Sequence, residues 1–245
     1  MRTALLVFLA AAGVLRADSF SDLKATIGAL HGAAPIRATV QLQKTEVDRG
    51  KKPPETVSGT AAVEASVDAE GLHIAYAPAL VARVAKEQAD RQANSELHAP
   101  TASAVAELGP LAIAERLDFG RSLLSILSKS ELNSEKRVVL DGRPARLLAL
   151  KVKNPPPKTS IGHVEILEDS FNVWIGDDNV PVAAQRTERY SGGILFLKMQ
   201  IAQTSRWSFV KRDDRLVAVR TEEQSRQNGF GQDRDETSVY TVALK

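Results

Sequence analysis

Hydrophobic positions in the first part of the chain change their spacing from that of a helix to that of a strand. Phe20, Leu23, Ile27 and Leu30 recur at steps of three and four residues, and Gly32 follows them. This spacing predicts a short amphipathic helix that ends near the glycine. The next three strand candidates are ATVQLQKTEV, TVSGTAAVEASV and GLHIAYAP, separated by the turn-forming stretches DRGKKPPE and DAEG.

The middle of the chain favours helices. Pro78 stands at a helix-entry position, and helix-favouring residues continue from it through Leu97. The segments TASAVAEL and AERLDFGRSLLSILSKSEL follow, with a break at Gly109–Pro110. We therefore predict two or three helices between residues of about 78 and 131.

After Asn133 the pattern returns to strands. EKRVVLDGRPARLLALKVK carries Asp-Gly between two apolar runs, which is typical of a hairpin. The later strand candidates are separated by DDNVP, SGG, KRDD and QNGFGQD, all of turn-forming composition. This order of elements predicts an α+β fold, in which a curved antiparallel sheet buries the apolar edges of the helices on its concave face.

The N-terminal residues have the pattern of a secretory signal. Arg2 precedes an apolar run from Ala4 to Leu15, after which the chain turns polar. The run is shorter than the ~20 residues of a membrane-spanning helix. We expect residues 1–17 to be a signal peptide cleaved near Ala17, and residues 18–245 to form a single domain that contains the helical insertion at about 78–131. The expected location is periplasmic or secreted, without a permanent membrane anchor.

Composition removes several classes of function. The chain contains no cysteine, which excludes thiolate nucleophiles, cysteine zinc sites and iron–sulfur clusters. The formal net charge is +2, and both Arg2 and Arg16 lie within the predicted signal. The remaining charge is near zero, so net charge gives no reason to expect a nucleic-acid partner.

The order of elements resembles the periplasmic lipoprotein-carrier superfamily (the LolA/LolB type). The matching pieces are SFSDLKATIGALHG, ATVQLQ, DFGRSLLSILS and VWIGDDNVPVAAQRTER. The resemblance lies in the succession of a helix, strands, a helical lid and a closing meander, and no functional residue is carried over. It implies that residues 18–245 form an open half-barrel with a helical lid, and that a cavity between lid and sheet takes acyl chains or another apolar ligand.

No motif predicts catalysis. The histidines, His31, His73, His98 and His163, form neither HxxxH nor HExxH. DFG at Asp118–Gly120 lacks the glycine-rich and catalytic loops of a kinase, and no nucleophile elbow or phosphate-binding loop is present. We expect no enzyme, no catalytic residue and no cofactor. An enzyme of unknown type stays a third hypothesis, which would require a cleft where His73 or His163 meets an acid.

Acidic residues gather at the ends of predicted strands, at Asp177–Asp178, at Asp213–Asp214, and at Asp233 with Asp235 and Glu236. A calcium loop needs oxygen ligands at alternating positions, a glycine for the bend and a bidentate glutamate. This spacing is missing from GDDNVP, so we predict solvated turns and no metal site. In FNVWIGDDNVPVAAQRTERY the two aspartates are predicted to form the tip of a hairpin.

Apolar residues supply the candidate ligand site. In ILFLKMQIA both faces of a predicted strand are apolar, which indicates a strand covered on both sides. An ordinary core explains this pattern, and so does a lined cavity. The side chains predicted to contact a ligand are Leu123, Leu124 and Leu127 from the lid, and Leu195, Leu197 and Met199 from the sheet.

The leading hypothesis is an exported protein that binds or carries an apolar or acylated ligand, such as a lipid or lipoprotein, between lid and sheet. The alternative is a non-catalytic structural or protein-interaction module of the cell envelope, with a partner protein and no ligand. The volume between the helices and the sheet separates the two, because a filled interior leaves no room for a carried ligand.

Overall fold

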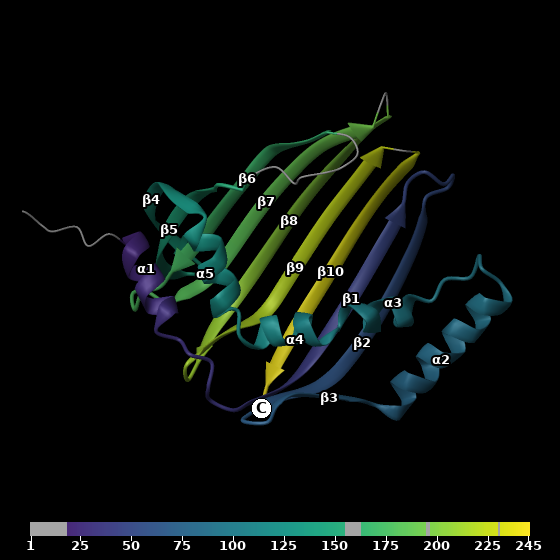
Figure 1. Ribbon diagram of the computed structural model, residues 1–245, viewed down its shortest axis with the longest axis horizontal. Helices are drawn as coiled ribbons and strands as arrows, with labels where there is room; N and C mark the ends of the chain where they lie inside the picture. The colour runs from purple at the N-terminus through teal and green to yellow at the C-terminus, as the bar shows by residue number, and fades with distance from the viewer. Residues whose placement is uncertain (1–18, 155–162, 195–196, 230) are drawn as a thin grey trace, which may run out of the picture.

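The computed structural model describes residues 19–154, 163–194, 197–229 and 231–245. These residues form one ten-stranded antiparallel sheet in the order β3-β2-β1-β10-β9-β8-β7-β6-β5-β4. Apart from β1 and β10, neighbouring strands also follow one another along the chain (Figure 1). The sheet is curved and open, so the predicted α+β class is confirmed. The predicted signal, residues 1–17, lies outside the described residues.

Most strands are long. Their bounds are β1 (Ile36–Asp48), β2 (Glu55–Asp68), β3 (Gly71–Tyr76), β4 (Ser130–Leu140), β5 (Arg143–Val152), β6 (His163–Ile175), β7 (Pro181–Ile194), β8 (Leu197–Arg212), β9 (Arg215–Gly229) and β10 (Gln232–Leu244). The hairpin predicted at Asp141–Gly142 joins β4 to β5. Both residues have positive φ, 49° and 77°, as a tight two-residue hairpin turn requires.

The described helices are α1 (Ser19–Gly28), α2 (Pro78–Ala93), α3 (Pro100–Glu107), α4 (Pro110–Leu117) and α5 (Gly120–Ser128). α2, α3 and α4 each begin with proline, whose fixed φ suits the first helical turn and whose missing N–H has no partner to lose there. The stretch predicted at 78–131 thus holds four helices instead of two or three, because the chain also breaks at Asp118 between α4 and α5.

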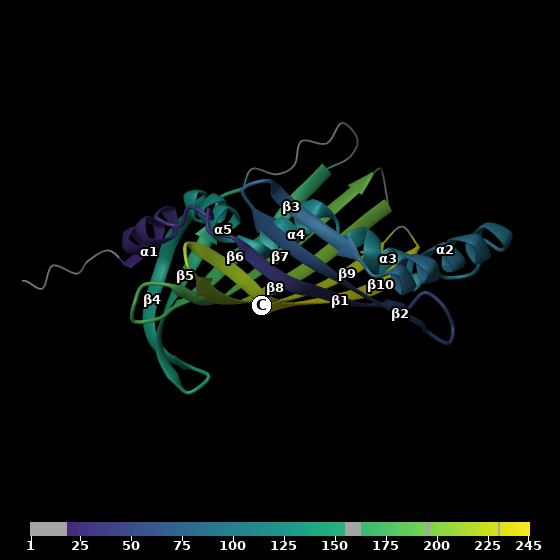
Figure 2. The same cartoon turned by 90° about the horizontal axis from the view of Figure 1, so that it is seen from below.

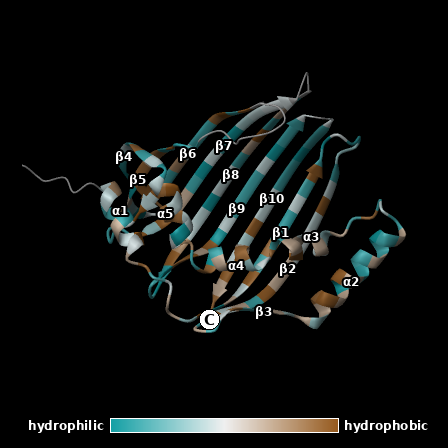
Figure 3. Ribbon diagram, viewed as in Figure 1, coloured by the Kyte–Doolittle hydropathy of each residue, from teal (hydrophilic) through white to brown (hydrophobic). Residues whose placement is uncertain are grey.

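The helices lie against one face of the sheet, which we call the inner face, and α2 extends beyond the edge of the sheet (Figures 1 and 2). Two apolar clusters hold them there. α1 and α5 pack on the half of the sheet that contains β5 to β9, and α3 and α4 pack on the half that contains β1, β2 and β10. Beyond the helices the strands carry many hydrophilic residues (Figure 3). No described helix has the length and apolar character needed to cross a membrane.

The prediction of a turn at SGG is wrong. Ser191, Gly192 and Gly193 continue β7, and the two glycines pair with Met199 and Lys198 of β8. Neither glycine has a positive φ, so both are extended and the strand passes through them. The strands β7 and β8 are instead joined at residues 195–196, which lie outside the described residues.

The linker between α1 and β1 is fixed by the turn between β8 and β9. The carboxylate of Asp214 accepts hydrogen bonds from the backbone N–H groups of Ala33 and Ala34, at 2.8 and 3.0 Å. Arg215 donates from Nε to the carbonyl oxygen of Ala34 at 2.7 Å. These bonds lower the pKa of Asp214. They place α1 over the inner face at the start of β9.

Candidate functional site on the inner face

The inner face changes from apolar to charged along each central strand. In β1 the buried Val40 and Leu42 are followed, at the same two-residue spacing, by Lys44, Glu46 and Asp48. Residues two apart share one face of a strand, so these charged groups lie on the inner face beyond the helices. The neighbouring β10 repeats the change in the opposite direction, through Arg234, Glu236, Ser238, Tyr240 and Val242.

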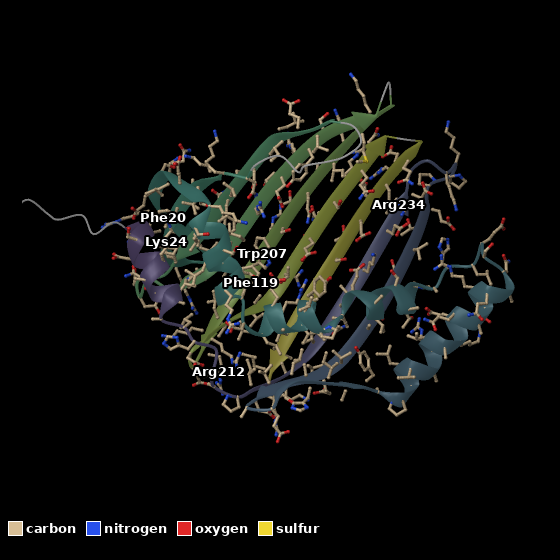
Figure 4. All side chains as sticks on the ribbon, viewed as in Figure 1. Phe20, Lys24, Phe119, Trp207, Arg212 and Arg234 are labelled. Atoms are coloured by element: carbon tan, nitrogen blue, oxygen red, sulfur yellow. The ribbon has the colours of Figure 1, made fainter. Side chains whose placement is uncertain are left out.

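One row of inner-face side chains crosses seven strands and contains no cation. Strand pairing places its members side by side in the order Val57, Glu46, Glu236, Ser225, Gln203, Glu188 and Asp169. We call these seven residues the carboxylate row, since four of them are acids. Arg234 is in the adjacent row, and Figure 4 places it far from Phe119 and Trp207 under the helices.

The cations beside the carboxylate row are shared between acids. Lys44 contacts Glu107 of α3 and lies 3.2 Å from Glu236. Burial opposes the charge of this lysine, but the two glutamates outweigh burial and raise the pKa of Lys44. One cation between two carboxylates leaves a local excess of negative charge at the β1 end of the row.

The other end of the row has the same arrangement. Nη2 of Arg186 lies 2.8 Å from Asp169 and 3.0 Å from Glu188. Tyr190 donates a hydrogen bond of 2.6 Å to Glu188, and burial together with that glutamate raises the pKa of Tyr190 to about 12. Asn154 also donates to Asp169, whose side chain is buried. This end is therefore an ordered network rather than a set of loose surface charges.

α4 is tied to the sheet close to the row. Arg116 donates to Glu223 at 3.1 Å and to the carbonyl oxygen of Ala112 at 2.9 Å, and its guanidinium stacks 3.5 Å from the ring of Tyr240. Burial raises the pKa of Glu223. Arg116 counteracts part of that rise, and nearby glutamates, Glu107 first among them, add to it. Burial is thus the main reason that the pKa of Glu223 is raised beside an arginine, and the neighbouring acids act in the same direction.

A cavity of about 350 Å³ opens at the β1–β2 end of the row. Its floor is formed by the sheet and its wall by the connection between α2 and α3, which passes over Val57 and Gly59. Gly59 is required there, because a Cβ atom would overlap the backbone of Pro100 at the start of α3. Charged lining residues of both signs are Lys44, Glu46, Arg91, Glu96 and Arg234.

The space under α5 is filled by the chain itself. Leu123 and Leu127 are 0% exposed and belong to the apolar cluster on β5–β9. Leu124 is half-buried and packs against the same cluster. Phe119 completes the contact, with its ring 5.4 Å from that of Trp207 and 5.2 Å from that of Phe209.

Among the described side chains predicted to contact a ligand, Met199 lies far from those of α5. Met199 is half-buried on β8, eight positions from Trp207 in the α5 cluster, which is roughly 26 Å of strand. Leu197 starts β8, and its side chain lies outside the description. Leu195 lies outside the described residues. Whether any of the predicted leucines binds a ligand stays a prediction.

The remaining candidates from the sequence lie at or next to turns, except Asp233, Asp235 and Glu236, which were predicted to lie in a turn and are part of β10. Gly176 donates to the carbonyl oxygen of Val180 at 3.0 Å, and Asp178 accepts from the N–H of Val180 at 3.1 Å, which closes the predicted hairpin tip. His73 lies on β3, just after the turn from β2, and its ring is 3.3 Å from Asp68; these two residues and Glu70 form an exposed group of three potential metal ligands. The side chain of His163 lies outside the description.

Sequence reasoning missed the carboxylate row, because it treated polar residues in strands as solvent-facing. A signal was present in the sequence. Lys44, Glu46 and Asp48 have the same parity as the apolar Val40 and Leu42, so they had to lie on the face that the core uses.

Sequence comparison finds no matching protein family and no matching curated protein. Among solved structures, the crystal structure of MucB in complex with MucA(peri) is similar over 91% of this chain and 92% of that chain, at 9% sequence identity and a TM-score of 0.18. With a TM-score this low, neither the fold nor the partner of MucB can be assigned to this chain. The chain is therefore characterised by its own residues: an open antiparallel sheet with a filled interior under its helices and a carboxylate row beyond them.

Proposed function

We propose that this protein is a non-catalytic interaction module of the cell envelope, which binds a partner protein on the part of the inner face that its helices leave open. The observation that carries the proposal is the division of that face. Two apolar clusters fill the part under the helices, and charged and polar side chains line the rest. Placement in the envelope rests on the predicted signal at residues 1–17.

Carriage of an apolar or acylated ligand between lid and sheet is the other function that the sequence predicts. Such a ligand needs free volume beneath the helices. Leu123, Leu127 and Leu117 occupy that region and are 0% exposed, so carriage would require α4 or α5 to leave the sheet. Docking on the open part of the inner face requires no such displacement, which is why we favour it.

Blocking the open face tests this proposal. The chain has no cysteine, so a single introduced thiol can be labelled selectively. Gln203→Cys lies in the carboxylate row, and Thr204→Cys places the same label on the opposite face of β8. We expect a bulky maleimide at residue 203 to abolish partner capture from an envelope extract, and the same label at residue 204 to leave capture intact.

Equal capture by the two labelled proteins would contradict docking on the inner face. Native mass spectrometry of the unlabelled protein, purified from its own cell envelope, supplies an independent measurement. We expect the mass of the polypeptide without an acyl ligand. A co-purifying lipid, together with lipid transfer between vesicles, would instead favour the carrier function.

A further inference from the structure

We infer that the partner presents a cationic segment, an extended stretch of polypeptide rich in lysine or arginine that lies across the carboxylate row. This inference rests on the proposed docking at the inner face and adds the chemistry of the partner.

The open part of the inner face carries an excess of negative charge. Among the described residues, nine carboxylates face six cations there, a formal difference of three charges. The acids are Glu46, Asp48, Glu55, Glu96, Glu107, Asp169, Glu188, Glu223 and Glu236, and the cations are Lys44, Lys51, Arg91, Arg116, Arg186 and Arg234. A surface of one sign attracts a partner segment of the opposite sign and excludes segments of like sign.

The outer face of the same strands shows no such excess among the ion pairs of its described residues. Its acids have arginines of their own: Glu222 lies 3.6 Å from both Arg206 and Arg220, and Glu168 lies 3.3 Å from Arg189. On the inner face Arg234 pairs with Glu46 at 3.2 Å, but Lys44 and Arg186 are each shared between two acids, so acids outnumber cations there. Charge complementarity therefore assigns the cationic partner to the inner face.

The acids in the middle of the row are accessible. The side chains of Glu46 and Glu236 are 31% and 37% exposed. Ile201 and Tyr190 in the adjacent row offer apolar surface for the methylene stem of a lysine or arginine. A long basic side chain can thus place its stem on that row and its charge against the carboxylates.

The length of the row sets the length of the segment. Seven strands at about 4.8 Å spacing span roughly 29 Å, which corresponds to about nine residues of extended polypeptide. Every second side chain of such a segment faces the sheet, so about four or five basic residues would meet the four carboxylates of the row. A small polycation would not match this spacing.

Fluorescence anisotropy with the full chain tests the inference. The probes are a labelled peptide of alternating lysine and serine, about ten residues long, its glutamate–serine counterpart, and spermine as an unlabelled competitor. We expect the lysine peptide to bind, with an affinity that falls as salt rises, and the glutamate peptide not to bind. In the double variant Glu46→Gln, Glu236→Gln we expect binding at least about tenfold weaker, equivalent to ~1.4 kcal/mol.

The matched control is the double variant Glu64→Gln, Glu168→Gln, which removes two acids that pair with Lys245 and Arg189 on the outer face. We expect it to bind the lysine peptide like the wild type, with circular dichroism reporting the fold of both variants. Absence of binding by the wild type, or an equal loss in both double variants, would overturn the inference. So would competition by spermine at concentrations similar to the peptide's own.

The two proposals fail separately. The label on residue 203 blocks any partner on the inner face, whatever the charge of that partner. If that label stops partner capture and the lysine peptide still does not bind, the docking surface stands and only the cationic chemistry is wrong. If the peptide binds and the label has no effect on capture, the interaction with the natural partner lies elsewhere.

Discussion

Asp214 holds the junction between α1 and the sheet, although the sequence predicts a solvated turn there. Its two carboxylate oxygens each accept one backbone N–H, from Ala33 and Ala34. The bonds join positions about 180 residues apart along the chain. No local pattern contains that information, because a strand-end aspartate looks the same whether or not a distant linker reaches it.

We expect Asp214→Ala to lower the urea midpoint of unfolding, because two backbone N–H groups lose their acceptor. The pKa of Asp214 is lowered in the folded state by these bonds, so its stabilising effect is present above the pKa of the unfolded state and is lost as pH falls through the folded pKa. The difference from wild type should therefore shrink in acid. Asp213→Asn is the control, since Asn tolerates the φ of 53° at that position.

Among single residues, the conformations of those in turns could be predicted best from the sequence. Asp141, Gly142 and Asn179 adopt the positive φ that their residue types favour, at the turns expected from the sequence. The turn predicted at Ser191–Gly193 was wrong, because glycine permits a turn without requiring one. Pairing with β6 and with β8 keeps this segment extended.

At the scale of elements, α5 behaves as part of the core. We expect Leu127→Ala to cost about 2–5 kcal/mol in the free energy of unfolding, because the side chain is 0% exposed in a filled cluster. Leu124→Ala, at a half-buried position on the same helix, should cost less. Urea unfolding measures both. A negligible loss for Leu127→Ala would mean that the helix is a loose lid after all.

α2 is held to the fold by Leu80, which packs against the apolar cluster on β1, β2 and β10, and by one glutamate. Glu87 accepts the N–H groups of Thr101 and Ala102, at 2.8 and 3.0 Å, and so caps the start of α3 from a neighbouring helix. α2 itself has no buried residue. This explains how a helix that extends beyond the sheet can still have a fixed position.

We expect Glu87→Gln to destabilise the protein by about 0.5–1 kcal/mol, in the range for losing a helix cap. Burial opposes ionisation of Glu87, but hydrogen bonds from Thr101 and Ala102 outweigh it and lower the pKa. The stabilising effect is therefore present above the unfolded pKa and lost below the folded one. Lys86→Gln, on the exposed side of the same helix, is the control. Hydrogen exchange at α3 should rise only in the Glu87 variant.

The helices and strands were largely predictable from the sequence, but the side chains that each strand presents on its two faces were predictable only in part. Helix and strand follow from spacing and from the prolines at 78, 100 and 110. To predict the composition of the inner face, the two-residue spacing of Val40 and Leu42 has to be continued to the charged end of β1. Pairing of β1 with β10 then brings Glu46 beside Glu236, which no pattern within either strand reveals.

At the scale of the whole molecule, the crowding of acids should make the free energy of unfolding depend on pH. Burial and neighbouring glutamates raise the pKa of Glu223 in the folded state despite Arg116. An acid with a raised folded pKa stabilises below its unfolded pKa, and that contribution is lost as pH rises through the folded value. We expect the stability of the wild type relative to Glu223→Gln to fall as pH rises from about 4.3.

The measurement is the urea midpoint of both proteins at a series of pH values. The slope is opposite to those expected for Asp214 and Glu87, which lose their effect in acid. Wild type and variant with parallel profiles above pH 4.3 would show that Glu223 ionises as freely in the folded protein as in the unfolded chain.

The pairing of β1 with β10 also has a consequence for biosynthesis. β1 is translated before the other strands and β10 after all of them, yet the two pair from Ala38–Leu244 to Asp48–Arg234 in the middle of the sheet. Until β10 emerges, the nascent hairpins β1–β2–β3 expose an unpaired strand edge and half of an apolar cluster. The sheet can therefore be completed only after the last strand has been synthesised, however early its first three strands pair with one another.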